Sequence, residues 1–347
     1  MPSPPPTVSR RRVLIGAAAL ALLGGTVAAC GSPPPPPEVD ELATQLDRAR
    51  ADSQLAADAA AATPPPPTAQ ALTAVASERS AHAQALSDEL VRIVGKKAPT
   101  TTTTTTAQPA TAPTTKDVIA ALRQSADAAA QLAAKQSGYR AGLLGSIAAS
   151  CTAAYTVALV PAGGSAMTTP EPSPATTTTP STTITTTTTT SSRAADPTTP
   201  GRPSDAANGA LFDAIATEQA TIYGYGLVSA HSTPDANDLV STALAEHRDR
   251  REGAIAMLKA RSVEPPLPAA GYQLPIEVDN PTDAANLAVR MEEDAAVAWR
   301  AVLEQATEEQ DRSFAVAALT ECAVTAARWS RVLGISPITV AFPGGSE

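Results

Sequence analysis

Apolar residues recur at helical spacing in eight separate stretches of the chain, and proline- or threonine-rich segments separate them. Proline cannot continue a helix, so these segments mark helix ends. The pattern predicts an all-α protein. The expected helices are residues 39–61, 69–94, 116–135, 137–160, 207–230, 238–261, 282–304 and 308–333.

The eight stretches fall into two similar groups of four. In each group a long loop follows the second stretch, and three positions line up: residues 122–129 with 289–296, Glu78 with Glu246, and Cys151 with Cys322. Alanine-rich low complexity can also produce such matches, but the shared element order favours a duplicated domain. Four helices with one long middle crossover match a ferritin-like bundle.

The fold class that follows is two ferritin-like four-helix bundles joined by a disordered Thr/Pro linker. The expected bundles are residues 38–162, the more diverged copy, and residues 207–344. The linker covers residues 163–206, where threonine tracts and prolines cannot bury a core. These tracts resemble O-mannosylated spacers of exported actinobacterial proteins, and an unmodified flexible linker is the alternative.

The first 29 residues have the features of an export signal. Arg10 and Arg11 precede a short apolar run that ends in small residues at Cys30, which is typical of a secretory signal rather than a membrane span. The arginine pair resembles a twin-arginine export motif, and residues 27–30 resemble a bacterial lipobox. We expect a lipid anchor at Cys30, with residues 30–37 as a Pro-rich stalk; a plain signal anchor is the alternative.

Composition and charge limit the possible fold classes and binding partners. Aromatic residues make up 3% of the chain, too few for a β-sandwich or barrel, and three cysteines are too few for a disulfide scaffold. The net charge of −9 disfavours a nucleic-acid partner. No other segment reaches about 18 apolar residues, so we expect no further membrane span. The expected location is the outer face of the cytoplasmic membrane.

The second group of helices carries a distinctive set of residues: Glu218, residues 223–226, residues 229–231, residues 246–248 with Arg251, and residues 341–344. By these residues it resembles a ferritin-like domain of unknown function found in exported actinobacterial proteins and lipoproteins. The resemblance covers about residues 207–344 and implies a helical bundle without specifying an activity.

A di-iron bundle needs a Glu from two helices and Glu-x-x-His from the other two, and neither half contains Glu-x-x-His. Helical spacing directs a set of polar residues inward instead. Carboxylates that face arginines are satisfied by ion pairing, so we expect a polar network and no cofactor; an iron or manganese site is the alternative. The residues concerned are Glu218, Glu246, His247, Arg251, Glu292, Glu321 and Arg328.

Other candidate chemistry is limited. Glu78 and His82, four apart on one helix, are either a ligand pair or a local hydrogen-bonded or solvated pair. Tyr223 and Tyr225 are either oxidation relays or core aromatics. Cys151 and Cys322 are expected as buried free thiols, with an inter-domain disulfide as the alternative.

The favoured function is a non-catalytic binding or scaffold lipoprotein of the cell envelope. Its partner would be an envelope protein, a lipid or a cell-wall component. A metal-dependent redox or iron-handling protein is the alternative, and a carrier for an apolar small molecule is a further one.

Overall fold

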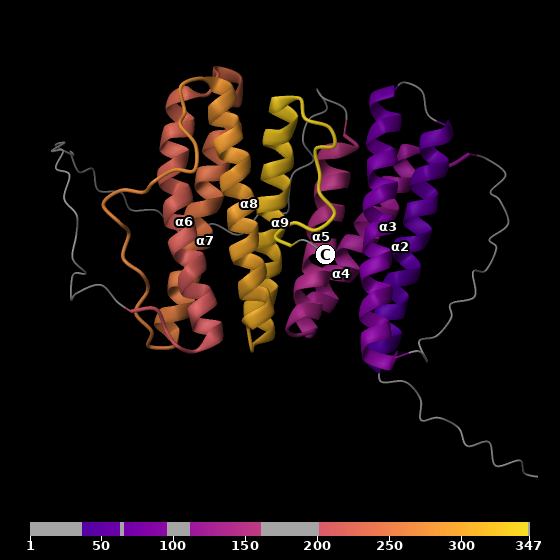
Figure 1. Ribbon diagram of the computed structural model, residues 1–347, viewed down its shortest axis with the longest axis horizontal. Helices are drawn as coiled ribbons and strands as arrows, with labels where there is room; N and C mark the ends of the chain where they lie inside the picture. The colour runs from indigo at the N-terminus through magenta and orange to yellow at the C-terminus, as the bar shows by residue number, and fades with distance from the viewer. Residues whose placement is uncertain (1–36, 63–65, 96–111, 161–200, 346–347) are drawn as a thin grey trace, which may run out of the picture. The chain divides into compact units, whose positions relative to one another are not determined.

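The computed structural model describes residues 37–62, 66–95, 112–160 and 201–345, and within these ranges it is all-helical, with no strand (Figure 1). The predicted all-α class is therefore confirmed. The export signal with Arg10 and Arg11, Cys30, the stalk before residue 37 and most of the linker lie outside the described residues. The helices are α2 (Pro37–Ala62), α3 (Pro66–Val94), α4 (Thr115–Lys135), α5 (Tyr139–Ala153), α6 (Ala206–His231), α7 (Asn237–Ala260), α8 (Pro281–Gln305) and α9 (Glu309–Leu333).

Local sequence signals explain several helix ends. Thr114 and Asp117 form a capping box at the start of α4. Asn280 caps α8, whose first residue is proline. Gly334 ends α9 in the left-handed conformation with φ of 70°. The stretch expected as residues 137–160 is shorter than predicted, because α5 ends at Ala153 and continues as a π-helical turn, η2 (Ala154–Ala158).

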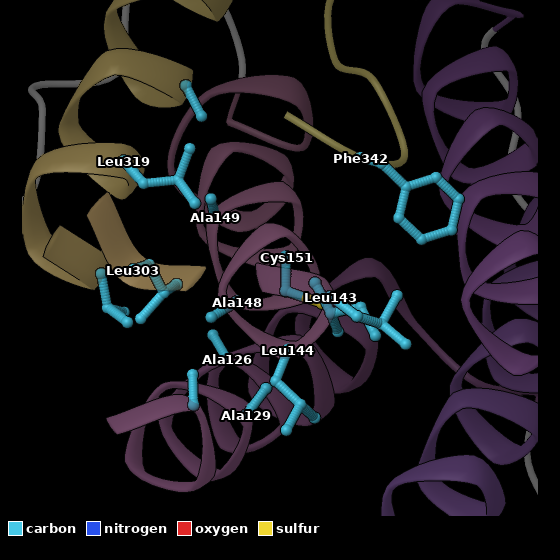
Figure 2. Close-up of a cluster of buried hydrophobic side chains, with 14 of the residues drawn as sticks. Ala126, Ala129, Leu143, Leu144, Ala148, Ala149, Cys151, Leu303, Leu319 and Phe342 are labelled. Atoms are coloured by element: carbon cyan, nitrogen blue, oxygen red, sulfur yellow. The ribbon is translucent and has the colours of Figure 1, made fainter. Parts of the chain in front are cut away.

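Small side chains bring α5 against the second group of helices. A side chain at Gly145 of α5 would collide with Leu303 of α8. Next to it, Ala148 and Ala149 of α5 lie close to Leu303 and to Leu319 of α9 (Figure 2). The apolar core thus continues from the first four helices into the last four, and the described residues from Glu38 onward group as one compact unit.

Arginines of the second group also bind backbone carbonyls of the first. Arg312 of α9 donates from Nε to the carbonyl of Ala134 at 2.7 Å. Arg331 donates to the carbonyls of Val157 and Val160. Carbonyls at the end of a helix have no partner within the helix, so a guanidinium there satisfies them and complements the helix dipole.

One described segment, Tyr139–Ala158, is long and apolar enough to cross a membrane by length and composition alone. This differs from our expectation that no further stretch would qualify. Its side chains pack inside the protein, with 78% of the apolar window buried. We therefore assign it to the core.

Residues 336–345 follow α9 as an irregular segment, which we call the C-terminal strap. Thr339 donates to Oε1 of Glu78 at 2.6 Å, and Ser146 of α5 donates to the carbonyl of Pro343 at 2.7 Å. Phe342 packs edge-on against the ring of His82 on α3, with centroids 5.1 Å apart; Figure 2 shows Phe342 beside the N-terminal helices. The strap therefore connects the end of the chain to α3 and α5.

Candidate functional site

A cluster of charged side chains lies in the interior of the second group of helices. Glu218 comes from α6, His247 and Arg250 from α7, and Glu292 from α8. Glu218, His247 and Glu292 are 0% exposed and Arg250 is 4% exposed. Buried charges are stable only when they are paired. We call these four residues the C-terminal polar centre.

His247 lies between two carboxylates. Its Nδ1 is 2.6 Å from Oε2 of Glu218, and its Nε2 is 2.9 Å from Oε1 of Glu292. Burial by itself lowers the pKa of His247. The charge of Glu292 and the hydrogen bonds to both carboxylates outweigh burial and raise this pKa to about 9. At this pKa the imidazole is mainly protonated at neutral pH. Nη2 of Arg250 lies 2.7 Å from the same Nδ1, a contact between two donor groups that the flanking carboxylates have to offset.

Arg250 joins the centre to the surface of the bundle. Its Nε donates to Oε1 of Glu218 at 3.0 Å, and its Nη1 donates to Oε2 of Glu321 on α9 at 2.8 Å. The Glu321 side chain is 42% exposed, so this end of the network meets solvent. Burial raises the pKa of Glu218, but the Arg250 charge and the His247 hydrogen bond outweigh it, so the pKa is lowered overall.

Three aromatic side chains complete the network. The Tyr225 hydroxyl donates to Oε1 of Glu292 at 2.5 Å, and Nε1 of Trp329 donates to the Tyr225 oxygen at 2.9 Å. Nε1 of Trp299 donates to Oε1 of Glu218 at 2.6 Å. The pKa of Tyr225 is raised well above its usual value by burial and by the charge of Glu292. Oε2 of Glu292 has no hydrogen-bond partner in the described part of the chain.

The structure brings together Glu218, His247 and Glu292, as helical spacing predicted, and adds Glu321 through Arg250. Arg251 does not join them: it pairs with its neighbour Glu252 and its side chain is 29% exposed. Positions 250 and 251, three and four residues after His247, lie on opposite sides of its helix face, about 60° and 40° away. Arg250 is on the side where Glu218 of α6 and Glu321 of α9 lie. Arg250 therefore holds the place expected for Arg251.

Glu246 and Arg328 lie beside the centre rather than in it. Oε2 of Glu246 accepts a hydrogen bond from Thr325 at 3.4 Å. Burial and the charge of Glu321 raise the pKa of Glu246, and the charges of Arg250 and Arg328 oppose this. Sequence reasoning missed Trp299 and Trp329. The sequence did contain a signal, because a buried indole N–H needs a hydrogen-bond acceptor. The helices that carry these two tryptophans pack beside helices with inward-facing carboxylates.

The first four helices hold a related buried group, the N-terminal polar centre: Asp52 of α2, Arg79 of α3, Ser125 of α4 and Cys151 of α5. Arg79 Nη2 is 3.0 Å from Oδ2 of Asp52, and Ser125 donates to the same oxygen at 2.6 Å. Arg79 Nη1 lies 3.4 Å from Sγ of Cys151. Each helix of the first group contributes one residue, as in a four-helix bundle with a polar interior.

The two centres occupy matching positions with exchanged side chains. Glu78, Arg79 and His82 align with Glu246, His247 and Arg250, so the arginine and the histidine change places. Ser125 aligns with Glu292. The counterpart of Glu218 is Asp52, because each of these carboxylates lies on the first helix of its group and pairs with an arginine of the second helix.

Glu78 and His82 do not pair with each other. Each side chain instead forms a hydrogen bond with the C-terminal strap. Nε2 of His82 lies 2.6 Å from the carbonyl of Ala341, and its Nδ1 lies 3.0 Å from Arg79. Burial and the Arg79 charge lower the pKa of His82 to about 3. Neutral His82 therefore donates from Nε2 and accepts from Arg79 at Nδ1.

The cysteines are consistent with structural roles. Cys151 and Cys322 are both free and buried, as expected from the sequence. Burial raises the pKa of Cys151 to about 11 and that of Cys322 well above its usual value. The thiols are protonated at neutral pH, and a protonated buried thiol is a poor nucleophile.

The donor set of the C-terminal polar centre does not suit a di-metal site. In the described ranges, no group of three or more His, Cys, Asp and Glu side chains is placed to hold a metal ion. The carboxylate oxygens of Glu218 already accept from Arg250, Trp299 and His247. A metal would have to displace a guanidinium that is itself buried and positively charged.

Fold and site together define an all-α helical-bundle protein with buried ionic centres. Residues 210–347 match the family described as a domain of unknown function (DUF4439). The solved structure of a conserved hypothetical protein from Mycobacterium tuberculosis is similar, with 60% identity, covering 38% of this chain and 99% of that one, at a TM-score of 0.37. Comparison with curated proteins gave no match.

Proposed function

We propose that the protein is a non-catalytic binding or scaffold lipoprotein of the cell envelope, built from two diverged ferritin-like bundles. The observation that carries this proposal is the pairing of Arg250 with Glu218 and Glu321. In this arrangement the guanidinium and His247 balance carboxylates that a metalloenzyme of this architecture would use as ligands. The centre then stabilises helix packing and leaves the surface and cavities for binding.

The repeated four-helix order and the matching polar centres support two diverged bundles. Asp52, Arg79 and Ser125 connect three helices of the first group in the way that Glu218, His247 and Glu292 connect three of the second. The lipid anchor and the twin-arginine route rest on Arg10, Arg11 and Cys30 in the sequence alone. Mass spectrometry of the N-terminal peptide of the mature chain tests them: a Cys30 peptide without acyl groups would exclude the anchor.

Elemental analysis tests the non-metal part of the proposal. The purified mature chain is incubated with Fe(II) or Mn(II), passed over a desalting column and measured. We expect no stoichiometric metal and no rise in the unfolding temperature, because a ligand that binds the native state would stabilise it. One tightly held ion per chain, lost in Glu218→Gln, would instead establish the metal-dependent alternative.

The apolar-carrier alternative is favoured by one observation, a cavity of about 660 Å³ between α8, α9 and the C-terminal strap. This volume lies within the range of about 300–1,000 Å³ that is common for small-molecule sites. If the protein acts by binding a small molecule, this cavity is the place. Lipid or another small molecule that co-purifies with the chain carrying Cys30→Ser would support this form of the function.

A further inference from the structure

The cavity under the C-terminal strap has small apolar walls. α8 and α9 contribute alanines to it, and the strap and Ala153 at the end of α5 also line it. Because alanine fills little space between helices, volume remains where leucine would close it. The apolar wall includes Ala153, Ala296, Ala323, Ala327, Ile338 and Phe342.

The strap beside this cavity is fixed by contacts with several helices. Gly344, with φ of 76°, lies so close to α8 that a side chain there would collide with the carbonyl of Ala296. Thr339 and Pro343 are bonded to Glu78 and Ser146 of the first group of helices. The strap is therefore held by the rest of the fold rather than by filling the cavity that it covers.

The charged part of the lining is mainly acidic. Glu292, Glu293 and Asp294 of α8 line the cavity together with one cation, Arg290. Arg290 lies 3.4 Å from Asp294 and pairs with it. Glu292 is balanced by His247 and Asp294 by Arg290, so the excess negative charge of the lining is that of Glu293.

Glu292 supplies the polar anchor. Its Oε1 is occupied by Tyr225 and His247, whereas its Oε2 is buried and has no hydrogen-bond partner among the described residues. A buried carboxylate oxygen without a donor is unfavourable, and a ligand that supplies an N–H group would relieve that cost. The nearby carboxylate of Glu293 makes a positively charged donor better than a neutral one.

We propose that this cavity binds an amphiphilic amine, with the ammonium group donating to Oε2 of Glu292 and the hydrocarbon part lying along the alanines of α8 and α9. The proposal deepens the binding function proposed above and rests on it. Acidic lining excludes fatty acids and phosphate-headed lipids, whose head groups carry the same charge. Each methylene that enters the apolar part strengthens binding by about fourfold.

Three ligands with the same ten-carbon chain test the proposal: decylamine, decanol and decanoate. Each is titrated by calorimetry, below its micelle concentration, into the full mature chain carrying Cys30→Ser, so that no acyl chain competes. We expect decylamine to bind at least about tenfold more tightly than decanol, and decanoate to bind most weakly. Equal or tighter binding of decanol or decanoate would overturn the assignment of an amine, while leaving an apolar carrier intact.

A matched pair of variants on α9 locates the site. Ala326 lines the cavity, and Ala317 is exposed on the same helix. Ala326→Leu should reduce decylamine affinity at least about tenfold through lost volume, and Ala317→Leu should bind as the wild type does. If all three ligands fail to bind the wild type, or if Ala326→Leu binds normally, the cavity is not the site; binding of a macromolecular partner would be unaffected by that result.

Glu292→Gln distinguishes the contribution of the ligand's head group to binding from that of its hydrocarbon chain. The amide retains a carbonyl oxygen but loses the charge, so the preference for decylamine over decanol should disappear while decanol binding persists. Retained decanol binding shows that the variant is folded. A preference for decylamine that survives in this folded variant would exclude Glu292 as the anchor.

Discussion

Thr339 of the C-terminal strap donates a hydrogen bond of 2.6 Å to Oε1 of Glu78 on α3, a residue 261 positions earlier in the chain. The acceptor is a buried carboxyl group whose pKa is raised to about 7 by burial, an effect that the Thr339 bond only partly opposes. The strap is therefore held at a group that titrates near neutral pH, and its stability should depend on pH.

Glu78→Gln tests this dependence. A carboxyl whose pKa rises from 4.5 to about 7 on folding takes up a proton in the native state, so stability decreases as pH rises from about 4.5 through 7. The variant lacks this loss. We expect it to be more stable than the wild type by about 3 kcal/mol well above pH 7 and similar to it below pH 4.5. Urea unfolding across this range measures the difference, with exposed Glu41→Gln as the charge-matched control.

His247 should contribute to the pH dependence of folding stability in a second, more alkaline range. Its pKa rises from 6.5 to about 9 on folding, so its stabilisation is complete below about pH 6.5 and is lost as pH rises through 9. His247→Gln leaves Glu292 without a cation and Glu218 with Arg250 alone, and it should cost about 3–5 kcal/mol at pH 6. The cost should shrink by pH 9.5. A cost that is independent of pH would mean that the native imidazole is neutral.

The matching control for that experiment is His231→Gln. His231 lies in the last turn of α6 and is only partly buried. Its replacement should change the free energy of unfolding by less than about 1 kcal/mol at either pH, as surface-proximal substitutions generally do.

Adjacent arginines on α7 provide another test. Arg250→Met removes a cationic partner of Glu218 and Glu321 and should destabilise the protein by about 3–5 kcal/mol, because the buried Glu218 then keeps only His247 as a cation. Arg251→Met removes a partly exposed side chain that pairs with Glu252, and its effect should stay within about 0.5–1 kcal/mol. Equal effects from the two substitutions, measured by thermal or urea unfolding, would contradict the placement of Arg250 in the centre.

Two helical glycines should respond oppositely to alanine. A Cβ added at Gly226 of α6 would meet no atom within 4 Å, so Gly226→Ala should stabilise the protein by about 0.5–1 kcal/mol through helix propensity. Gly145 of α5 lies against Leu303 at the contact between the two groups of helices. Gly145→Ala should destabilise by about 1–3 kcal/mol through overpacking. Urea unfolding measures both effects, and stabilisation by both would show that α5 and α8 are not in close contact.

Much of the helical structure follows from local sequence. Proline and glycine positions, capping residues and apolar spacing act over a few residues, so they predicted all eight helices and most of their ends. Spacing also predicted that Glu218 and His247 face inward, because residues three or four apart share a helix face. The end of α5 was misjudged, since a π-helical turn keeps the apolar pattern while changing the hydrogen bonds.

Pairing between distant side chains required the fold. The choice of Arg250 over Arg251 depends on which of two adjacent side chains reaches Glu218, and one residue corresponds to a rotation of about 100° around the helix axis. The sequence shows that both arginines are near the inner face. Only the packing of α6 against α7 selects one.

By itself, the sequence determined the all-α class, the helix positions, the repeated order of four and four, and the acidic, alanine-rich character of the chain. Tertiary structure decided that the two groups share a continuous core, that His82 is neutral while His247 is charged, and that the strap covers a cavity beside Glu292. The physical reason is the distance along the chain over which each property is determined. Helix formation depends on neighbours within a few residues, whereas burial, pKa and cavity volume depend on atoms that the fold brings together from distant parts of the chain.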